Sequence, residues 1–175
     1  MERLLETVNS ARDRLVVTWL ADGGLRIGEL CGLYLVDLHL RENASCGECR
    51  SLHLHVCHRP GNPNRAKTKH AWQVEHGTVT GGRIKRFSPA MVHAYFECVT
   101  SEYPRGAGHG MLLVQLHGPG TGQPWAPVGA RRMLARAGQP PRLPAQFYVG
   151  GPRRRRRQSA DRPGRRRLGL GRHGR

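Results

Sequence analysis

Fifteen consecutive residues carry the strongest structural signal in this chain: Gly23-Gly-Leu-Arg-Ile-Gly-Glu-Leu-Cys-Gly-Leu-Tyr-Leu-Val-Asp37. Their apolar positions recur at helical spacing and predict a short buried helix, entered through a pair of glycines. Glu29 follows Arg26 by three positions, a spacing at which a carboxylate holds a guanidinium in place. Arg26 is therefore anchored from behind while its outer face stays free for a ligand. An ordinary helical ion pair gives the same local pattern, so the neighbouring sequence has to decide between the two.

This segment resembles the first arginine box of the tyrosine recombinases, the phage-integrase family. The box usually reads Thr-Gly-Leu-Arg-x-x-Glu-Leu-x-x-Leu followed by an Asp, and Gly23 replaces the threonine here. The matching residues are Gly24, Leu25, Arg26, Glu29, Leu30, Leu33 and Asp37. The resemblance implies that Arg26 is catalytic and stabilises charge on the non-bridging phosphate oxygens, with Glu29 and Asp37 as structural support.

A lysine follows the box at the position that the family pattern requires. In the recombinases the box leads into a β-hairpin that carries a catalytic lysine. Here Leu52–Val56 predicts the first strand, and Asn62–Lys69, which contains Pro63, predicts the turn. The resemblance implies that Lys67 protonates the departing 5′-oxygen, and Lys69 is the alternative in a shifted register. Without the resemblance, Lys67 is simply a basic turn residue.

The charge of the chain favours a nucleic-acid partner. The net charge is +17, and residues 139–175 contribute twelve arginines against one acid, Asp161. The tail therefore carries +11 and residues 1–138 carry +6. A surplus of Lys and Arg favours phosphate contact through counterion release. We expect DNA as the partner, although scattered surface charge is more often only solvated. The expected DNA-binding residues are Arg65, Lys69, Arg83, Lys85 and Arg86.

Apolar patterns predict four further elements outside the box. They are a helix over Glu2–Ala21 bent near Asn9-Ser10, a helix from Ser88-Pro89 to Tyr103, an extended buried segment over Met111–Leu116, and a helix over Pro127–Ala137 stopped by Gly138. The predicted class is α+β, mainly α, with a small β-sheet. This order is similar to the recombinase catalytic domain, incomplete at the C-terminus and without the family's separate N-terminal DNA-clamping domain. We expect a partial catalytic domain over residues 1–138 and a tail over residues 139–175.

The tail lacks the remaining motifs of the family, which are His-x-x-Arg, a second His or Trp, and the nucleophilic Tyr. No histidine is followed by an arginine three positions later, and Tyr148 is the only tyrosine after Tyr103. Clusters of Pro, Gly and Arg predict disorder. With permissible codons, the stretch from Pro140 read one nucleotide later can spell Pro-His-Ala-Phe-Arg-His, which contains the missing box. We interpret the tail as out-of-frame sequence and expect an inactive strand transferase; a genuine basic tail is the alternative.

Five cysteines and no export signal predict reduced thiols rather than a disulfide framework. One cluster has the start of a zinc motif, and its members are Cys46, Cys49, His53, His55, Cys57 and His58. Its second half is crowded, and a hairpin with His53, His55 and Cys57 on one face explains the same spacing. We therefore expect no metal and no cofactor. No stretch is long and apolar enough to span a membrane, so we expect a cytoplasmic protein without a membrane partner.

Three function classes remain after these observations. The first is a DNA-binding remnant of a site-specific recombinase, whose intact relatives integrate and recombine the DNA of mobile elements as oligomers on DNA. The second is an autonomous basic nucleic-acid-binding protein, and the third is a zinc-stabilised interaction module. The arginine box together with Lys67 favours the first class.

Overall fold

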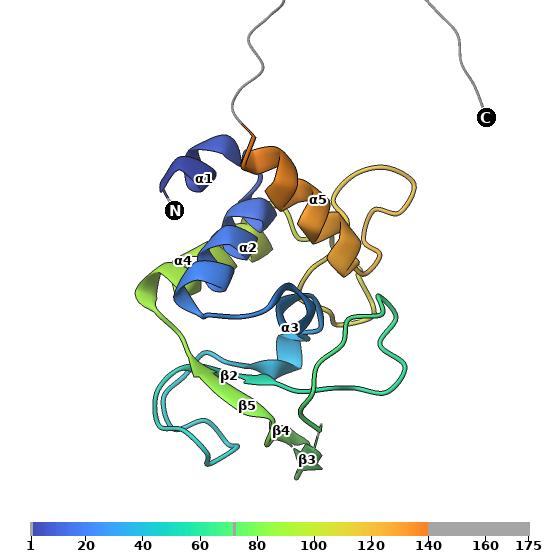
Figure 1. The fold of residues 1–175 in the computed structure, drawn as a ribbon. Coiled ribbons are helices and arrows are strands. Elements are labelled where there is room, and N and C mark those ends of the chain that lie inside the picture. The colour runs from blue at the N-terminus through green and yellow to red at the C-terminus, as the bar shows by residue number, and fades with distance from the viewer. Residues whose placement is uncertain (1, 72, 140–175) are drawn as a thin grey trace, which may run out of the picture. The chain divides into compact units, whose positions relative to one another are not determined.

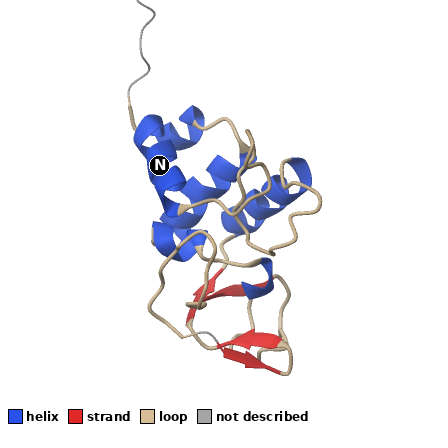
Figure 2. Ribbon diagram, turned by 90° about the vertical axis from the view of Figure 1, so that its right-hand side faces the viewer, coloured by secondary structure: helices blue, strands red, loops and turns tan. Residues whose placement is uncertain are grey.

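Helices and strands separate into two layers in the computed structural model of the chain, which describes residues 2–71 and 73–139 (Figures 1 and 2). These residues belong to one unit that spans Met1–Pro140. The α+β class is confirmed. The predictions for residues 140–175, disorder and an out-of-frame origin, lie outside the described residues. The elements are α1 Glu2–Thr7, α2 Ala11–Asp22, α3 Ile27–Cys31, the 3-10 turn η1 Leu35–Asp37, β1 Leu38–His39, β2 His53–Val56, β3 Gln73–Glu75, β4 Thr78–Thr80, β5 Arg83–Arg86, α4 Pro89–Ser101 and α5 Pro127–Ala137.

The first predicted helix is two helices, α1 and α2, and the break falls where the sequence placed it. Ser10 caps α2, because its side chain accepts a hydrogen bond from the Asp13 backbone N–H at 3.1 Å. In α2, Leu15, Val16 and Trp19 are fully buried. The Trp19 indole N–H donates to the Met91 carbonyl at 3.0 Å, which satisfies the polar atom of a buried ring and joins α2 to α4.

The two later helices begin and end close to their predicted positions. The Ser88 side chain caps α4 and Pro89 occupies its first turn, where a missing N–H costs nothing. Helix α5 spans Pro127–Ala137 and ends at Gly138, as predicted. The longest described helix, α4, has 13 residues. None of the helices in the described residues has the length and apolarity needed to cross a membrane.

Strand pairing differs from the predicted hairpin. In the three-stranded sheet the order is β1-β2-β5, and both pairs are antiparallel. Figure 1 shows β2 and β5 side by side. The prediction that β2 pairs with a strand directly after the 62–69 turn is wrong, because β3 and β4 form a separate hairpin. Asn64 and Ala66, which follow β2, are buried. The chain leaves the sheet after β2 because these two residues bury in the helical layer.

Alternation along β2 gives the sheet two chemically different faces. Leu54 and Val56 are fully buried and belong to the core that the helices cover. His53 and His55, also fully buried, point to the opposite face. The predicted extended segment near Met111 is confirmed: Met111 bridges to Tyr34, and residues 111–114 are buried without forming a long strand.

Candidate functional site

Arg26 stands at the first turn of α3 with its side chain in solvent. Gly24 has a φ of +56°, a left-handed conformation that glycine adopts without strain, and it turns the chain into the helix. The Arg26 side chain is 75% exposed. Its backbone N–H donates to the Glu29 carboxylate at 2.8 Å, and Arg26 Nη1 lies 4.0 Å from Glu29 Oε1. Glu29 therefore lies behind Arg26, while the guanidinium stays open to a ligand.

Glu29 is neutralised from the sheet rather than by Arg26 alone. Arg83 on β5 places Nη2 2.5 Å from Glu29 Oε2, and the Glu29 side chain is only 7% exposed. Lys85 lies two residues further along the same strand face. Its Nζ is 3.4 Å from the point where a Cβ on Gly24 would stand. Arg83, expected to bind DNA, is thus a half-buried partner of Glu29, and Lys85 adds a positive charge beside Arg26.

Lys67 lies in the loop between β2 and β3, residues 57–71, which we call the lysine loop. One buried amide holds this loop in place. Asn64 donates two hydrogen bonds, to the Cys31 carbonyl at 2.7 Å and to the Trp125 carbonyl at 2.9 Å. Its side-chain oxygen accepts from the Ala66 N–H at 3.0 Å. All three hydrogen bonds of the Asn64 side chain are buried. Asn64 therefore ties the loop to the end of α3 and to the start of α5.

A glycine in the arginine box lets the lysine loop approach α3. A Cβ on Gly28 would stand 2.9 Å from the Lys67 carbonyl oxygen, closer than real Cβ atoms come to other atoms. Gly32 lies one turn later and faces Ala66. A Cβ added to Gly32 would stand 3.5 Å from the Cβ of Ala66. The close approach of two backbones places Lys67 beside Arg26. Glycines at a spacing of four were visible in the sequence, but their partner was not.

Four positive side chains meet around the resulting groove. It has a volume of about 860 Å³ and runs from α3 to the lysine loop. Among the described residues that line it, the charged ones are Arg26, Lys67, Lys69, Arg131 and the neutralised Glu29. An adjoining pocket of about 580 Å³ shares Lys67 and Arg131 and adds Arg65. Positive charge therefore gathers around this groove.

Sequence reasoning missed Arg131, which α5 brings to the groove. Helix α5 packs against α3 (Figure 1), and Arg131 is exposed on its groove side. Burial raises the pKa of the Cys31 thiol to about 12, and the positive charge of Arg131 opposes that rise. Arg131 thus lies within electrostatic reach of α3. In the sequence it is one of several arginines on an amphipathic helix, with no motif to single it out.

Arg86 does not join the groove. On β5 it pairs in register with His53, so its side chain lies on the sheet face opposite Arg83 and Lys85. There it contacts Cys49, whose pKa is lowered chiefly by a hydrogen bond from Ser51 and also by Arg86. Arg86 therefore lies on the other face of the sheet from Arg83 and Lys85, because neighbouring strand residues face opposite sides. DNA binding by the three residues stays a prediction.

Asp37 supports the site from η1 rather than from the end of α3. It is fully buried and forms a two-pronged ion pair with Arg59, which begins the segment leading to Lys67. Its Oδ2 also accepts from the Tyr34 N–H at 2.8 Å. Arg59 in turn stacks over the Tyr34 ring, 4.5 Å from its centroid. Asp37 therefore fixes the start of the lysine loop to the turn after α3.

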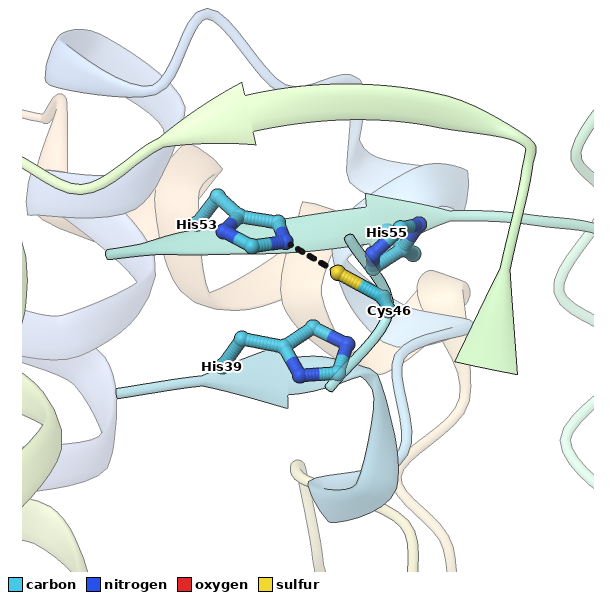
Figure 3. A group of neighbouring side chains, drawn as sticks. All are labelled: His39, Cys46, His53 and His55. Atoms are coloured by element: carbon cyan, nitrogen blue, oxygen red, sulfur yellow. Dashed lines mark hydrogen bonds between the residues drawn. The ribbon is translucent and has the colours of Figure 1, made fainter. Parts of the chain in front are cut away.

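The cysteine and histidine cluster also differs from the predicted set. The residues that meet are His39, Cys46, His53 and His55 (Figure 3). Cys57 is outside the group: its Sγ lies 4.0 Å from Asp37 Oδ1, and burial raises its pKa to about 11. Cys49 and His58 are also outside it. His39 was missed because it lies fourteen positions before His53, and only the pairing of β1 with β2 brings the two together.

Comparison of this chain with protein-family models, with curated proteins and with solved structures finds no match. The function must therefore be argued from the geometry of the groove.

Proposed function

We propose that this chain binds DNA through the groove around Arg26 and Lys67, as a remnant of a tyrosine-recombinase strand-transfer centre. One observation carries the proposal: the arginine of the box and the predicted lysine, 41 positions apart, line the same groove. Lys69, the alternative lysine, lines it too. The close approach at Gly28 and the buried hydrogen bonds of Asn64 hold Lys67 beside Arg26. Two unrelated surface cations would not be expected to be held together by such buried contacts.

The groove chemistry suits a phosphodiester. A guanidinium offers parallel N–H donors that match two non-bridging phosphate oxygens, and Arg26 presents this fork at 75% exposure. Lys67 is exposed and supplies a compact charge that can also donate a proton to an alkoxide. Because Arg83 neutralises Glu29, the carboxylate does not repel a bound anion. In an intact recombinase these two roles stabilise the phosphorane and release the 5′-hydroxyl.

A second candidate is an autonomous basic nucleic-acid-binding protein. The observation in its favour is the tail, where twelve arginines stand against one acid over residues 139–175. Such a segment binds any polyanion through counterion release. The two candidates differ in which residues carry the affinity: the groove in the first, the tail in the second.

Salt-dependent DNA binding separates the two candidates. We expect Arg26→Gln with Lys67→Gln, made in the full chain, to lower the slope of log K against log salt by about 2, since each lost phosphate contact removes about 0.9. Arg41→Gln with Arg105→Gln removes the same charge from exposed positions outside the groove lining and is the matched control. Fluorescence anisotropy of a labelled duplex measures both.

Equal slopes for the groove variant and its control would rule out the groove as the binding surface. If all measurable affinity then disappears when the twelve tail arginines become glutamine, the autonomous basic protein is the correct class. Circular dichroism of every variant confirms that the comparison is between folded proteins.

A further inference from the structure

Four side chains with metal-binding atoms converge on the sheet face opposite Leu54 and Val56 (Figure 3). Their ligand atoms all lie within 4.8 Å of one another, and His53 Nε2 is 3.1 Å from Cys46 Sγ. Strand pairing explains the meeting, because His39 on β1 stands opposite His53 on β2. His55 is two residues along the same strand and so shares the face of His53. The 40–52 loop brings Cys46 over them.

Two of the imidazoles are oriented by carbonyl groups behind them. His53 Nδ1 lies 2.7 Å from the Ser51 carbonyl oxygen, and His55 Nδ1 lies 2.8 Å from that of Gly81. A carbonyl oxygen only accepts, so each Nδ1 carries the proton. The Nδ1-protonated tautomer of each ring presents the lone pair of Nε2 to the centre of the cluster. Metal-binding histidines are commonly held in this way by an acceptor on their other nitrogen.

Two nitrogens of the cluster have no partner. Nε2 of His39 and Nε2 of His55 are buried without a hydrogen bond among the described residues. The His55 side chain is fully buried. The ring of His39 is hydrogen-bonded to the backbone of Val79, which fixes its orientation as well. Buried polar atoms are rarely left unpaired, and here they face a thiol and a third imidazole. A cation at the centre satisfies all of them at once.

We propose a structural zinc site whose ligands are Nε2 of His39, His53 and His55 and Sγ of Cys46. Zinc bonds of about 2.0–2.3 Å in a tetrahedron set ligand atoms about 3.3–3.6 Å apart. The ligand atoms now lie within 4.8 Å of one another, so zinc binding draws the widest pair together by about 1 Å, while Cys46 Sγ and His53 Nε2, at 3.1 Å, move slightly apart. Three nitrogens and one sulfur suit zinc, whereas calcium and magnesium require oxygen ligands. The set is closed, with four protein ligands and no open position, which is the pattern of a structural site.

Zinc binding releases one proton, and a neighbouring carboxylate offsets the remaining charge of the site. The Cys46 thiol loses its proton to solvent as the sulfur–zinc bond forms, and the three imidazoles stay neutral. The centre then carries a net charge of +1, from the zinc ion and one thiolate. Glu48 lies close enough to offset it, with Oε2 3.4 Å from His55 Nδ1. Its carboxylate also accepts the Gly81 N–H, so it is held in place.

The ion holds the long β1–β2 connection to the sheet. Residues 40–52 contain no helix or strand, and Ala44 is the only apolar residue of this segment that is buried. A bond from Cys46 to an ion held by three strand residues closes this loop without a hydrophobic core of its own. The site lies on the other side of the sheet from Arg26 and Lys67, so the proposal does not depend on the DNA-binding groove.

The test is the metal content of the full chain, purified without a histidine tag. Elemental analysis should find about one zinc per chain. Cys46→Ser should lose most of it, while Cys49→Ser keeps it, because Cys49 is outside the four-ligand group and contacts Ser51 instead. His55→Asn and His58→Asn form a second matched pair with the same expected contrast. Equal zinc loss in Cys46→Ser and Cys49→Ser would overturn the assignment of ligands.

Two measurements on the unmodified chain keep the proposal testable if Cys46→Ser does not fold. Cobalt should replace zinc and give the near-ultraviolet thiolate-to-cobalt absorption of a site with one sulfur ligand. Iodoacetamide labelling, read by mass spectrometry, should modify Cys46 only after a chelator has removed the metal. A folded, metal-free chain whose Cys46 labels equally with and without added zinc would overturn the proposal, whatever the result of the DNA-binding test.

Discussion

At the scale of single residues, Gly28 determines where Lys67 stands. Gly28→Ala puts a Cβ 2.9 Å from the Lys67 carbonyl oxygen, so the loop must move. We expect a loss of about 1–2 kcal/mol in unfolding free energy, because overpacking outweighs the gain of about 1 kcal/mol in helix propensity. DNA affinity should fall as well, since Lys67 leaves Arg26. Chemical denaturation and anisotropy measure the two effects.

Gly108→Ala is the matched control for this substitution. A Cβ on Gly108 meets no atom closer than 4.0 Å, and its φ is not in the left-handed range. We expect its stability to stay within about 0.5 kcal/mol of the unsubstituted chain. Gly28→Ala with undiminished stability and DNA affinity would show that the lysine loop is not held by this contact.

Sequence reasoning at this scale succeeded where partners are close in the chain. Arg26 and Glu29 are three residues apart, so helical geometry alone predicted their contact. Arg83 reaches the same carboxylate from β5, 54 positions later. The positive charge of Arg83 led to the prediction that it binds DNA. In the structure, tertiary packing pairs Arg83 with Glu29 instead. Local spacing predicts contacts within an element. It gives no information about which residue far away in the sequence forms an ion pair with Glu29.

At the scale of elements, the side chain of Asn64 holds the lysine loop to the helical layer. Asn64→Ala removes three buried hydrogen bonds and leaves the Cys31 and Trp125 carbonyls and the Ala66 N–H without this partner. We expect a loss of about 2–4 kcal/mol in unfolding free energy. Hydrogen exchange of residues 58–70 should rise more than that of α2, because α2 is buried independently of the loop.

Asn9→Ala makes the same chemical change at an exposed position between α1 and α2. It should alter stability by less than about 0.5 kcal/mol. An Asn64→Ala protein as stable as the Asn9→Ala protein would mean that other contacts hold the lysine loop.

Helices were easier to predict than strands. Ser88-Pro89 and Gly138 mark helix ends by local chemistry, and the structure places α4 and α5 between these signals. The hairpin prediction failed because strand pairing depends on a partner elsewhere in the chain. Val56 pairs with Arg83, 27 positions later, across the whole lysine loop. The buried side chain of Asn64, which a polar turn pattern does not reveal, diverts the chain.

At the scale of the whole molecule, the sheet separates two kinds of chemistry. One face of β2 carries Leu54 and Val56 into the helical core, beside which the cationic groove forms. The other face carries His53 and His55 into the metal-type cluster. Alternation along one strand therefore places the cationic groove and the cluster of metal-binding side chains on opposite faces of the sheet. The sequence displayed both sets of residues but not the sheet that divides them.

The whole chain should not cleave DNA, even though Arg26 and Lys67 line one groove. Strand transfer needs a tyrosine beside the phosphate, and the three tyrosines of the described residues are engaged elsewhere. Tyr34 lies under Arg59, and the Tyr103 hydroxyl donates to the Met111 carbonyl at 2.6 Å. Burial raises the pKa of Tyr95 and of Tyr103, which lowers the fraction of each phenol that is ionised at neutral pH. None of the three lines the groove.

A pool of nicked duplexes of random sequence tests this expectation without knowledge of a target site. An active recombinase stays covalently bound to such DNA. The short strand beyond the cut diffuses away, so its 5′-hydroxyl is no longer present to reverse the phosphotyrosine bond. We expect no covalent protein–DNA product on a denaturing gel from the full chain, whereas an intact recombinase supplied with its own nicked site gives one. A product mapped to Tyr148, the tyrosine outside the described residues, would contradict the expectation. It would mean that the tail supplies a nucleophile to the groove and that the arginine-rich segment is part of a working enzyme.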